Sequence, residues 1–312
     1  MLDSKLTQLI DDTAEILELP TAVIEKDYYV TQIIHAISKI ENEYFRLIFS
    51  GGTCLAKAHK IVKRMSEDVD FKIQIKTQEK LSRSRLIKEL KQFRAQIKSC
   101  IDHLSEFSIN NDVARNEGKY QYITLKYPSF FPTNSELRTE ILLEFTLSEI
   151  RLETQKMMIN TLIENTLKNA SLFTPSKTIC ISISETAIEK WVGLTRRIIA
   201  IERGYHADDE TLIRHVYDLN AINNNNGINT DFYHLAKIII ENDIAQVKNQ
   251  HPEYAENPHD EIKASLDLLK NKPLWKDRYH NFLENMVYEQ INVPDYSTAI
   301  QNIEQMSLRI VE

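Results

Sequence analysis

The sequence predicts an α+β protein whose C-terminal part is predominantly helical. Runs with the length and alternation of β-strands lie between residues 45 and 184, whereas helical spacing of apolar residues dominates from Glu185 onward. Charge also divides the chain, because residues 205–312 carry 9 Lys and Arg against 18 Asp and Glu, while the rest is close to balance. A chain of 312 residues is long enough for two domains. We therefore expect an α+β domain over residues 1–184 and a mainly helical domain over residues 185–312.

Composition narrows the class of protein. The hydrophobic fraction of 42% and the charged fraction of 27% are ordinary for a globular protein and argue against disorder. No apolar run approaches the roughly 18 residues that a membrane span needs, and the N-terminus is acidic where a signal peptide is basic. The three cysteines are far apart and form no CxxC pair. We therefore expect a soluble cytoplasmic protein that contacts no membrane and has neither a disulfide framework nor a zinc site.

The predicted elements follow from the periodicity of the apolar residues. The first forty residues have helical spacing interrupted at Pro20, and a short helix is expected to follow the glycine pair Gly51–Gly52. The polar segment 110–118 ends in glycine and is expected to be a loop. Strands are expected at residues 45–50, 69–75, 120–127, 137–147 and 178–184.

Residues 78–98 predict an amphipathic helix with a basic face. The segment carries seven Lys and Arg against two Glu, and its apolar residues recur at helical spacing. Two interpretations remain open, a solvated outer face or a surface that contacts a nucleic-acid backbone through clustered cations. The RNA-binding candidates on this face are Arg85, Lys88 and Arg94.

The segment with the sharpest chemical signal is FSGGT followed by SEDVDF, residues 49–71. A predicted strand runs into Gly51–Gly52, and Asp68 and Asp70 come on the next strand. Side chains at positions i and i+2 of a strand point to the same side, so the two carboxylates lie together and repel unless a cation joins them. Carboxylates combined with substrate phosphates are typical of Mg²⁺ sites, and glycine amides can approach the same phosphates. We therefore predict a Mg²⁺ site, with Mn²⁺ as an alternative, beside a phosphate-binding turn.

A third carboxylate is expected from a neighbouring strand if the site transfers phosphoryl groups with two metal ions. The predicted strand 137–147 offers Glu140 and Glu144 on one side. Glu144 is preferred as metal ligand or general base because it is embedded more deeply in the apolar run, and Glu140 is the alternative.

Cations for a triphosphate are expected on the helix that begins near Glu185. Its segment EKWVGLTRR contains Lys190, Arg196 and Arg197. Such cations could neutralise phosphates, although surface cations of an amphipathic helix are the plainer interpretation. Farther along, Arg214 and Asp218 are four residues apart and could form an ordinary helical ion pair.

These pieces together resemble the AbiEii family of nucleotidyltransferase toxins, which includes the mycobacterial MenT toxins. Four segments match in order over about residues 22–220: IEKDYYVTQII, GGT with RMSEDVDF, ETAIEKWVGLTRR and RHVYDL. The resemblance implies the mixed sheet of polymerase β-like nucleotidyltransferases, flanked by helices. One departure is visible, because the last motif usually reads RDxxD and His215 replaces its first Asp here.

The resemblance also implies roles for individual residues. Asp68 and Asp70 would bind Mg²⁺, Lys190 would act on the nucleotide, and Asp218 would complete the site despite the change at His215. The triphosphate would be held by Gly51, Gly52, Thr53 and Ser66, with Arg196 and Arg197 as further candidates.

The expected activity is therefore transfer of a nucleoside monophosphate from an NTP to an RNA acceptor, the 3′ end of tRNA in some members of the family. The family further implies a cognate antitoxin encoded nearby and a role in growth control or phage defence. Two alternatives remain open from the sequence. One is the same chemistry on a small molecule or a protein side chain, and the other is a non-catalytic module that binds nucleotide or RNA.

Overall fold

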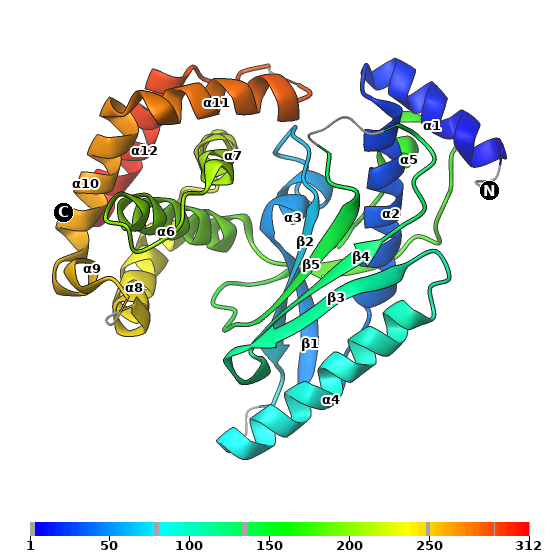
Figure 1. Cartoon of the computed structure of the whole chain (residues 1–312), viewed down its shortest axis with the longest axis horizontal. Coiled ribbons are helices and arrows are strands. Elements are labelled where there is room, and N and C mark those ends of the chain that lie inside the picture. Colours follow the sequence, from blue (N-terminus) through cyan, green and yellow to red (C-terminus); the bar gives the residue numbers. More distant parts are fainter. Residues whose placement is uncertain (1–3, 78–80, 133–136, 248–249, 290, 312) are drawn as a thin grey trace. The chain divides into compact units, whose positions relative to one another are not determined.

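The computed structural model describes residues 4–77, 81–132, 137–247, 250–289 and 291–311. Within it the chain divides into two compact units (Figure 1). The first unit comprises residues 1–60 and 65–181, and the second comprises residues 61–64 and 182–312. The sequence predicts a single boundary at residue 184, whereas the short segment 61–64 groups with the C-terminal helices.

A seven-stranded mixed sheet forms the centre of the first unit, with the strand order β3-β4-β5-β2-β1-β7-β6 (Figure 1). Strand β2 pairs with β1 in the antiparallel direction and with β5 in the parallel direction, and β1 pairs with β7 in parallel. The strands are β1 (Phe45–Ser50), β2 (Asp68–Ile75), β3 (Ser108–Arg115), β4 (Tyr120–Lys126), β5 (Glu140–Leu147), β6 (Gln155–Met158) and β7 (Lys177–Cys180).

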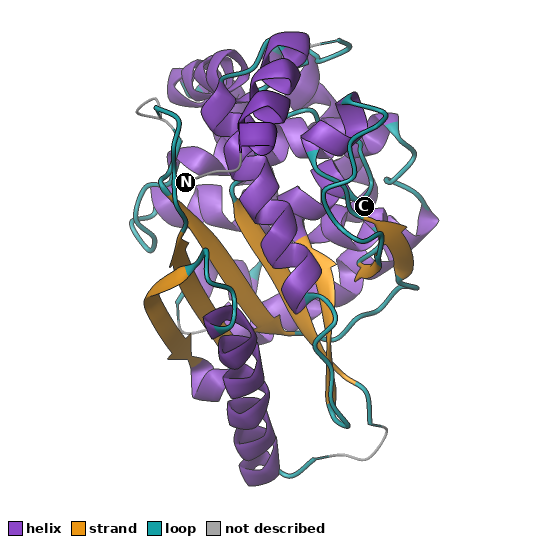
Figure 2. Cartoon of the chain, turned by 90° about the vertical axis from the view of Figure 1, so that its right-hand side faces the viewer, coloured by secondary structure: helices purple, strands orange, loops and turns teal. Residues whose placement is uncertain are grey.

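The two faces of this sheet differ in polarity and burial because the side chains alternate along the strands. One face is apolar and packs against helices, with Phe45, Phe71 and Phe145 among its fully buried side chains. Figure 2 shows helices lying across the strands of this unit. The opposite face of β2 and β5 is only partly buried and carries the charged residues. The helices of the unit are α1 (Ser4–Leu17), α2 (Thr21–Ile37), α3 (Gly51–Lys57), α4 (Arg83–Asp102) and α5 (Leu162–Thr166).

The second unit is helical and packs around α6. Trp191 of α6 is fully buried, and its indole Nε1 donates to the Ser307 hydroxyl at 2.9 Å. Proline stands in the first turn of three of the helices, where its missing N–H costs no helical hydrogen bond. The helices are α6 (Ile183–Glu202), α7 (Arg214–Asn224), α8 (Thr230–Val247), α9 (Pro252–Glu256), α10 (Pro258–Asn271), α11 (Pro273–Met286) and α12 (Tyr296–Val311).

The structure confirms the α+β class and corrects the interpretation of residues 110–118 as a loop. Most of that segment is strand β3, which pairs with β4 through a turn at residues 116–118. In this turn Asn116, Glu117 and Gly118 have positive φ angles. Because β3 is at the edge of the sheet and is mostly exposed, it lacks the apolar alternation that identifies a half-buried strand.

Two further boundaries differ from the prediction. The strand expected over 178–184 ends at Cys180, because the Ser182 side chain caps the first turn of α6. The basic helix starts at Arg83 after the cap at Ser82, and residues 78–80 of the predicted segment lie outside the described residues. Among the helices of the described residues, none is long and apolar enough to cross a membrane.

Candidate active site

The glycine turn lies directly against one of the predicted metal ligands. Gly51 follows the end of β1 with a φ of +75°, which disfavours any residue with a side chain. A Cβ atom at this position would come within 1.9 Å of Oδ2 of Asp70. Glycine is therefore required here both by backbone conformation and by the closeness of the carboxylate.

Thr53, in the first turn of α3, ties the glycine turn to the start of β2. Its hydroxyl donates to the Asp68 carbonyl and lies 2.8 Å from the Ser66 hydroxyl. The Thr53 side chain is buried and Ser66 is half-buried. These contacts hold the two predicted phosphate-binding hydroxyls next to the first aspartate.

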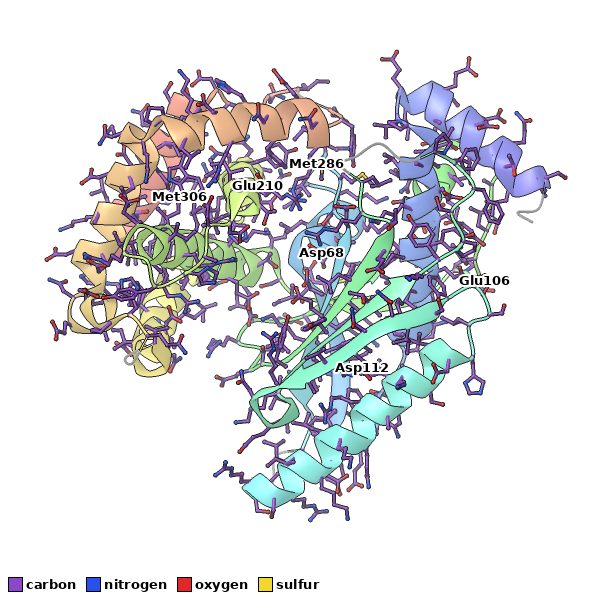
Figure 3. The ribbon with its side chains drawn as sticks, viewed as in Figure 1. Asp68, Glu106, Asp112, Glu210, Met286 and Met306 are labelled. Atoms are coloured by element: carbon purple, nitrogen blue, oxygen red, sulfur yellow. The ribbon has the colours of Figure 1, made fainter. Side chains whose placement is uncertain are left out.

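Asp68 and Asp70 lie on the partly buried, polar face of the sheet, as the spacing of two residues predicts. Asp68 is labelled in Figure 3. Its side chain is 31% exposed. Asp70 aligns with Ser50 on β1 and with Glu144 on β5, so it is flanked by residues of both neighbouring strands. The two carboxylates are therefore brought to one place, where they can be approached by a ligand.

The two candidates for a third carboxylate occupy different positions along β5. Glu144 is the direct neighbour of Asp70, whereas Glu140 lies two residues before Leu142, the neighbour of Asp68. The Tyr120 hydroxyl donates to Glu144, and burial together with this bond raises the pKa of Tyr120. Glu140 accepts a hydrogen bond from the Asn110 side chain at 2.7 Å. Register thus favours Glu144 as the partner of Asp70, while the role itself remains a prediction.

The donor set fits a metal that is shared with the substrate. Among the described residues, no group of three or more His, Cys, Asp and Glu side chains is arranged to hold a metal ion. Mg²⁺ is commonly held by one or two carboxylates, with water and substrate phosphates as the other ligands. Asp68 and Asp70 supply such a pair, and the Gly51 turn lies close against the Asp70 carboxylate.

The charged residues of the IEKDYY segment form a buried frame that the sequence analysis did not assign to the site. Lys26 is 1% exposed, and its Nζ donates to Oε1 of Glu67 at 2.6 Å. Burial lowers the pKa of Lys26, and the contact with Glu67 opposes this effect. Asp27 accepts bonds from Lys57 at the end of α3 and from the backbone of Leu162. Helix α2 thereby fixes both the segment before β2 and the helix that follows the glycine turn.

A signal for this frame was present in the sequence. Three consecutive charges, Glu25, Lys26 and Asp27, interrupt a helix that is otherwise largely apolar. Ionisable side chains on a buried helix must be paired, so such a run predicts partners elsewhere in the chain. Glu25 is fully buried and accepts from the Phe130 backbone and the Ser129 hydroxyl, and burial raises its pKa.

Lys190 and Asp218 come together in the second unit, in a cluster completed by Arg64. Asp218 is fully buried; Arg64 donates to both of its carboxylate oxygens at 2.7 Å, and Lys190 Nζ lies 2.6 Å from Oδ2. Burial alone would raise the pKa of Asp218, but Arg64 and Lys190 outweigh it and lower that pKa. Asp218 therefore pairs with Lys190 and Arg64. Its helical ion pair with Arg214, four residues before it, stays a prediction. Arg64, which precedes the SEDVDF motif, was missed by the sequence analysis.

His215, the departure from the usual motif, is an uncharged neighbour of this cluster. Its Nδ1 is 3.0 Å from the Lys190 carbonyl, and its ring packs against Gly193. Burial, with the positive charge of Lys190, lowers the pKa of His215 to about 3. A neutral imidazole thus occupies the place where the usual motif has a carboxylate.

The other predicted cations have partners of their own. Arg196 pairs with Asp243, and Arg197 pairs with Asp209. Neither pairing joins the cluster of Lys190 and Asp218, and the suggested nucleotide contacts of both arginines remain predictions.

The three candidate RNA contacts on α4 differ in exposure. Arg85 and Lys88 are exposed, and Arg85 donates to the Tyr44 hydroxyl at 2.7 Å. Arg94 is half-buried and packs over Gly118 in the β3–β4 turn. Arg94 therefore supports the hairpin, whereas Arg85 and Lys88 remain accessible.

A mixed sheet that carries a glycine turn beside paired aspartates is the arrangement expected of a nucleotidyltransferase. Comparison with known families agrees: residues 40–302 match the family described as nucleotidyl transferase AbiEii toxin, type IV TA system. The chain belongs to this family and is a nucleotidyltransferase toxin of a type IV toxin–antitoxin system. The resemblance found in the sequence is confirmed, and membership implies an antitoxin partner and an NTP substrate.

Comparison with other proteins adds little to the family match. The solved structures that match include MenT4, a nucleotidyltransferase toxin from Mycobacterium tuberculosis H37Rv, with a TM-score of 0.45 and 13% identity. The match covers 93% of this chain and 94% of MenT4. The search of curated proteins finds no match.

Proposed function

We propose that this toxin transfers a nucleoside monophosphate from an NTP to an RNA acceptor in a Mg²⁺-dependent reaction, with the 3′ end of tRNA as the specific candidate. The observation that carries the proposal is the position of Asp68 and Asp70. The two like charges share one face of β2, and Asp70 lies directly against the Gly51 turn. Two carboxylates kept together beside a glycine turn are suited to metal-assisted phosphoryl chemistry.

The residues of the first unit would bind the metal ion, orient the triphosphate and accept a proton. Asp68 and Asp70 would hold Mg²⁺, which supplies Lewis-acid stabilisation of the phosphate charge when bound. The turn at Gly51–Gly52 and the hydroxyl of Ser66 would orient the triphosphate. Glu144, aligned with Asp70, would accept the proton of the attacking hydroxyl.

The residues of the second unit would contribute positive charge. Lys190 would contact the nucleotide, and Arg64 is the second cationic partner of Asp218. Asp218 in this proposal holds Lys190 in position and touches no substrate.

An RNA acceptor is supported by the exposed cations of α4. Arg85 and Lys88 present charge to solvent on the helix that the sequence identifies as strongly basic. Contacts to phosphates would supply affinity without sequence preference, which suits a substrate class with a shared end. The corresponding partners are tRNA in the cytoplasm and the cognate antitoxin.

The proposal is tested by following label from α-³²P-NTPs into total tRNA. Each NTP is incubated separately with Mg²⁺, and wild-type chain is compared with Asp70→Asn. Asp112→Asn, on the edge strand β3 of the same sheet, is the matched control (Figure 3). We expect labelled tRNA with the wild type and the control, and none with Asp70→Asn or with γ-³²P-NTP.

The remaining outcomes separate the alternatives. Label that appears on protein or in a small product instead of tRNA would assign a different acceptor. No transfer from any NTP to any acceptor, with intact NTP binding, would favour a non-catalytic binding module.

A further inference from the structure

One arginine outside every sequence motif, Arg138, contacts Asp68, one of the two predicted metal ligands. The Nη1 of Arg138 donates to Oδ1 of Asp68 at 2.9 Å. The Arg138 side chain is 48% exposed, so its guanidinium can reach a ligand as well as the carboxylate. Arg138 lies two residues before β5, the strand that carries Glu144.

The backbone of Arg138 is clamped on both sides by the buried pair of Lys26 and Glu67. The Arg138 N–H donates to Oε1 of Glu67 at 2.8 Å, and the Arg138 carbonyl accepts from Lys26 Nζ at 2.7 Å. Lys26 and Glu67 are 1% and 2% exposed and contact each other at 2.6 Å. A buried ion pair is expensive to desolvate and is tolerated where its remaining hydrogen-bonding capacity is satisfied. Here each member of the pair makes one hydrogen bond to the peptide groups of Arg138.

This arrangement gives a fixed backbone and an accessible side chain. An arginine whose peptide is anchored keeps its guanidinium within a short radius of Asp68, while its exposed head remains able to change partner. Guanidinium groups bind phosphate oxygens in the same forked geometry in which they bind carboxylates. A guanidinium next to Asp68 can therefore bind either of two anions, the carboxylate or the phosphate of a ligand.

We propose that Arg138 is the resident counter-cation of Asp68 and a phosphate-contacting residue for the NTP, with Lys26 and Glu67 as the residues that position it. This inference rests on the proposed nucleotidyl transfer and deepens it. In the absence of substrate, Arg138 competes with a divalent cation for Asp68. With NTP bound, its guanidinium passes to a phosphate oxygen and leaves the carboxylate to the metal.

The competition predicts opposite effects of one substitution on two measurements. Arg138→Gln removes the competitor, so the protein should bind Mn²⁺ about two- to fivefold more tightly in a titration without nucleotide, the size expected for a half-exposed pair. The same variant loses a phosphate contact, so the KM for the NTP should rise, by about tenfold or more. A substitution that only loosened the structure would weaken Mn²⁺ binding and also raise the KM for the NTP.

A double variant and a control test whether the change in the KM for the NTP depends on the position of Arg138. Lys26→Met combined with Glu67→Leu removes the buried pair as a unit, which avoids leaving one buried charge unpaired. This double variant keeps the guanidinium but frees its backbone, so the NTP KM should rise by less than in Arg138→Gln. Arg83→Gln, which removes an exposed arginine paired with Glu117 on the outside of α4, is the matched control and should change neither quantity.

The outcomes distinguish this inference from the proposed function. If the wild type binds Mn²⁺ and transfers nucleotide but Arg138→Gln changes neither the Mn²⁺ affinity nor the NTP KM, the role of Arg138 is overturned and the transfer reaction stands. If Arg138→Gln weakens Mn²⁺ binding, the competition is overturned. A wild type that binds no Mn²⁺ removes the metal site of the proposed function, and the inference about Arg138 with it.

Discussion

Asp68 in the first unit and Asp218 in the second have opposite surroundings. Asp68 is 31% exposed and shares the face of β2 with a second carboxylate, whereas Asp218 is fully buried between Arg64 and Lys190. Asp68 has one exposed cationic partner, Arg138, and a second carboxylate beside it, so an added cation would still be stabilised there, whereas Asp218 already lies between two buried cations. The difference predicts separate roles for the two aspartates, both of which were expected in the site. Asp68 would bind the metal ion, and Asp218 would hold Lys190 in position.

The largest effect is expected where charge is removed from the accessible pair. Asp68→Asn and Asp70→Asn should each lower kcat/KM about 10³-fold or more, because each removes one ligand of the metal that the chemistry requires. The melting temperature should change little, since relief of the repulsion between the two carboxylates offsets the loss of the half-exposed pair of Asp68 with Arg138. Kinetics and thermal unfolding on the same preparations check this. Normal turnover in either variant would remove the metal role of the pair.

Within the buried cluster, the two cations should separate binding from stability. Lys190→Gln should lower kcat/KM about 10²-fold through loss of a charged contact to the nucleotide. Arg64→Gln removes the other partner of Asp218 and should mainly lower the free energy of unfolding, by about 3–5 kcal/mol, as expected for a broken buried pair. Both variants are compared at matched folded fraction. Equal loss of kcat/KM in the two variants would assign Lys190 a purely structural role.

Burial of His215 predicts that the free energy of unfolding depends on pH. The pKa of His215 in the folded protein is about 3, against about 6.5 when unfolded. Between these values only the unfolded chain takes up the proton, so stability should fall as the pH decreases from 6.5 toward 3, by about 1.4 kcal/mol per pH unit.

His215→Gln should flatten this slope, and His259→Gln, a substitution at an exposed histidine of α10, should not. Denaturant unfolding at a series of pH values measures both. A slope that persists in His215→Gln would mean that other groups cause the acid sensitivity. Asp218 does not cause the loss of protein stability that begins near pH 6.5. Its pKa is lowered, so its contribution to stability is lost only below about pH 4.

The smallest effect is expected at the surface of α4. Arg85→Glu with Lys88→Glu should raise the KM for tRNA about three- to tenfold at low salt, flatten its salt dependence and leave the KM for the NTP unchanged. Arg94 is left intact because it packs over Gly118. Lys237→Glu with Lys263→Glu makes the same change of charge at exposed positions of α8 and α10 and serves as control. Equal tRNA kinetics for both double variants would mean that the basic face of α4 is a solvated surface that does not contact tRNA.

Much of the first unit could be predicted because its strands are either half-buried or short apolar runs. The run 45–50 is mostly apolar, is ended by the glycine pair and coincides with β1, and the alternating run 69–75 differs from β2 by one residue. The edge strand β3 could not be recognised, because both of its sides are largely exposed.

The composition of the site could be predicted more fully than its contacts. The spacing of Asp68 and Asp70 places them on one face in any strand. By contrast, Lys26, Glu67 and Arg138 are brought together from positions 41 and 112 residues apart along the chain, which no local pattern reveals. The pairing of Lys190 with Asp218 depends in the same way on how α6 packs against α7.

The central claim is that Asp68 and Asp70 jointly hold the metal of nucleotidyl transfer. The most direct measurement is anomalous diffraction from crystals grown with Mn²⁺ and a non-hydrolysable NTP analogue, with each of the four bases in turn. We predict an anomalous peak within coordination distance of both carboxylates, with the triphosphate of the analogue against the Gly51 turn. A bound triphosphate whose Mn²⁺ peak lies away from both aspartates would contradict the claim.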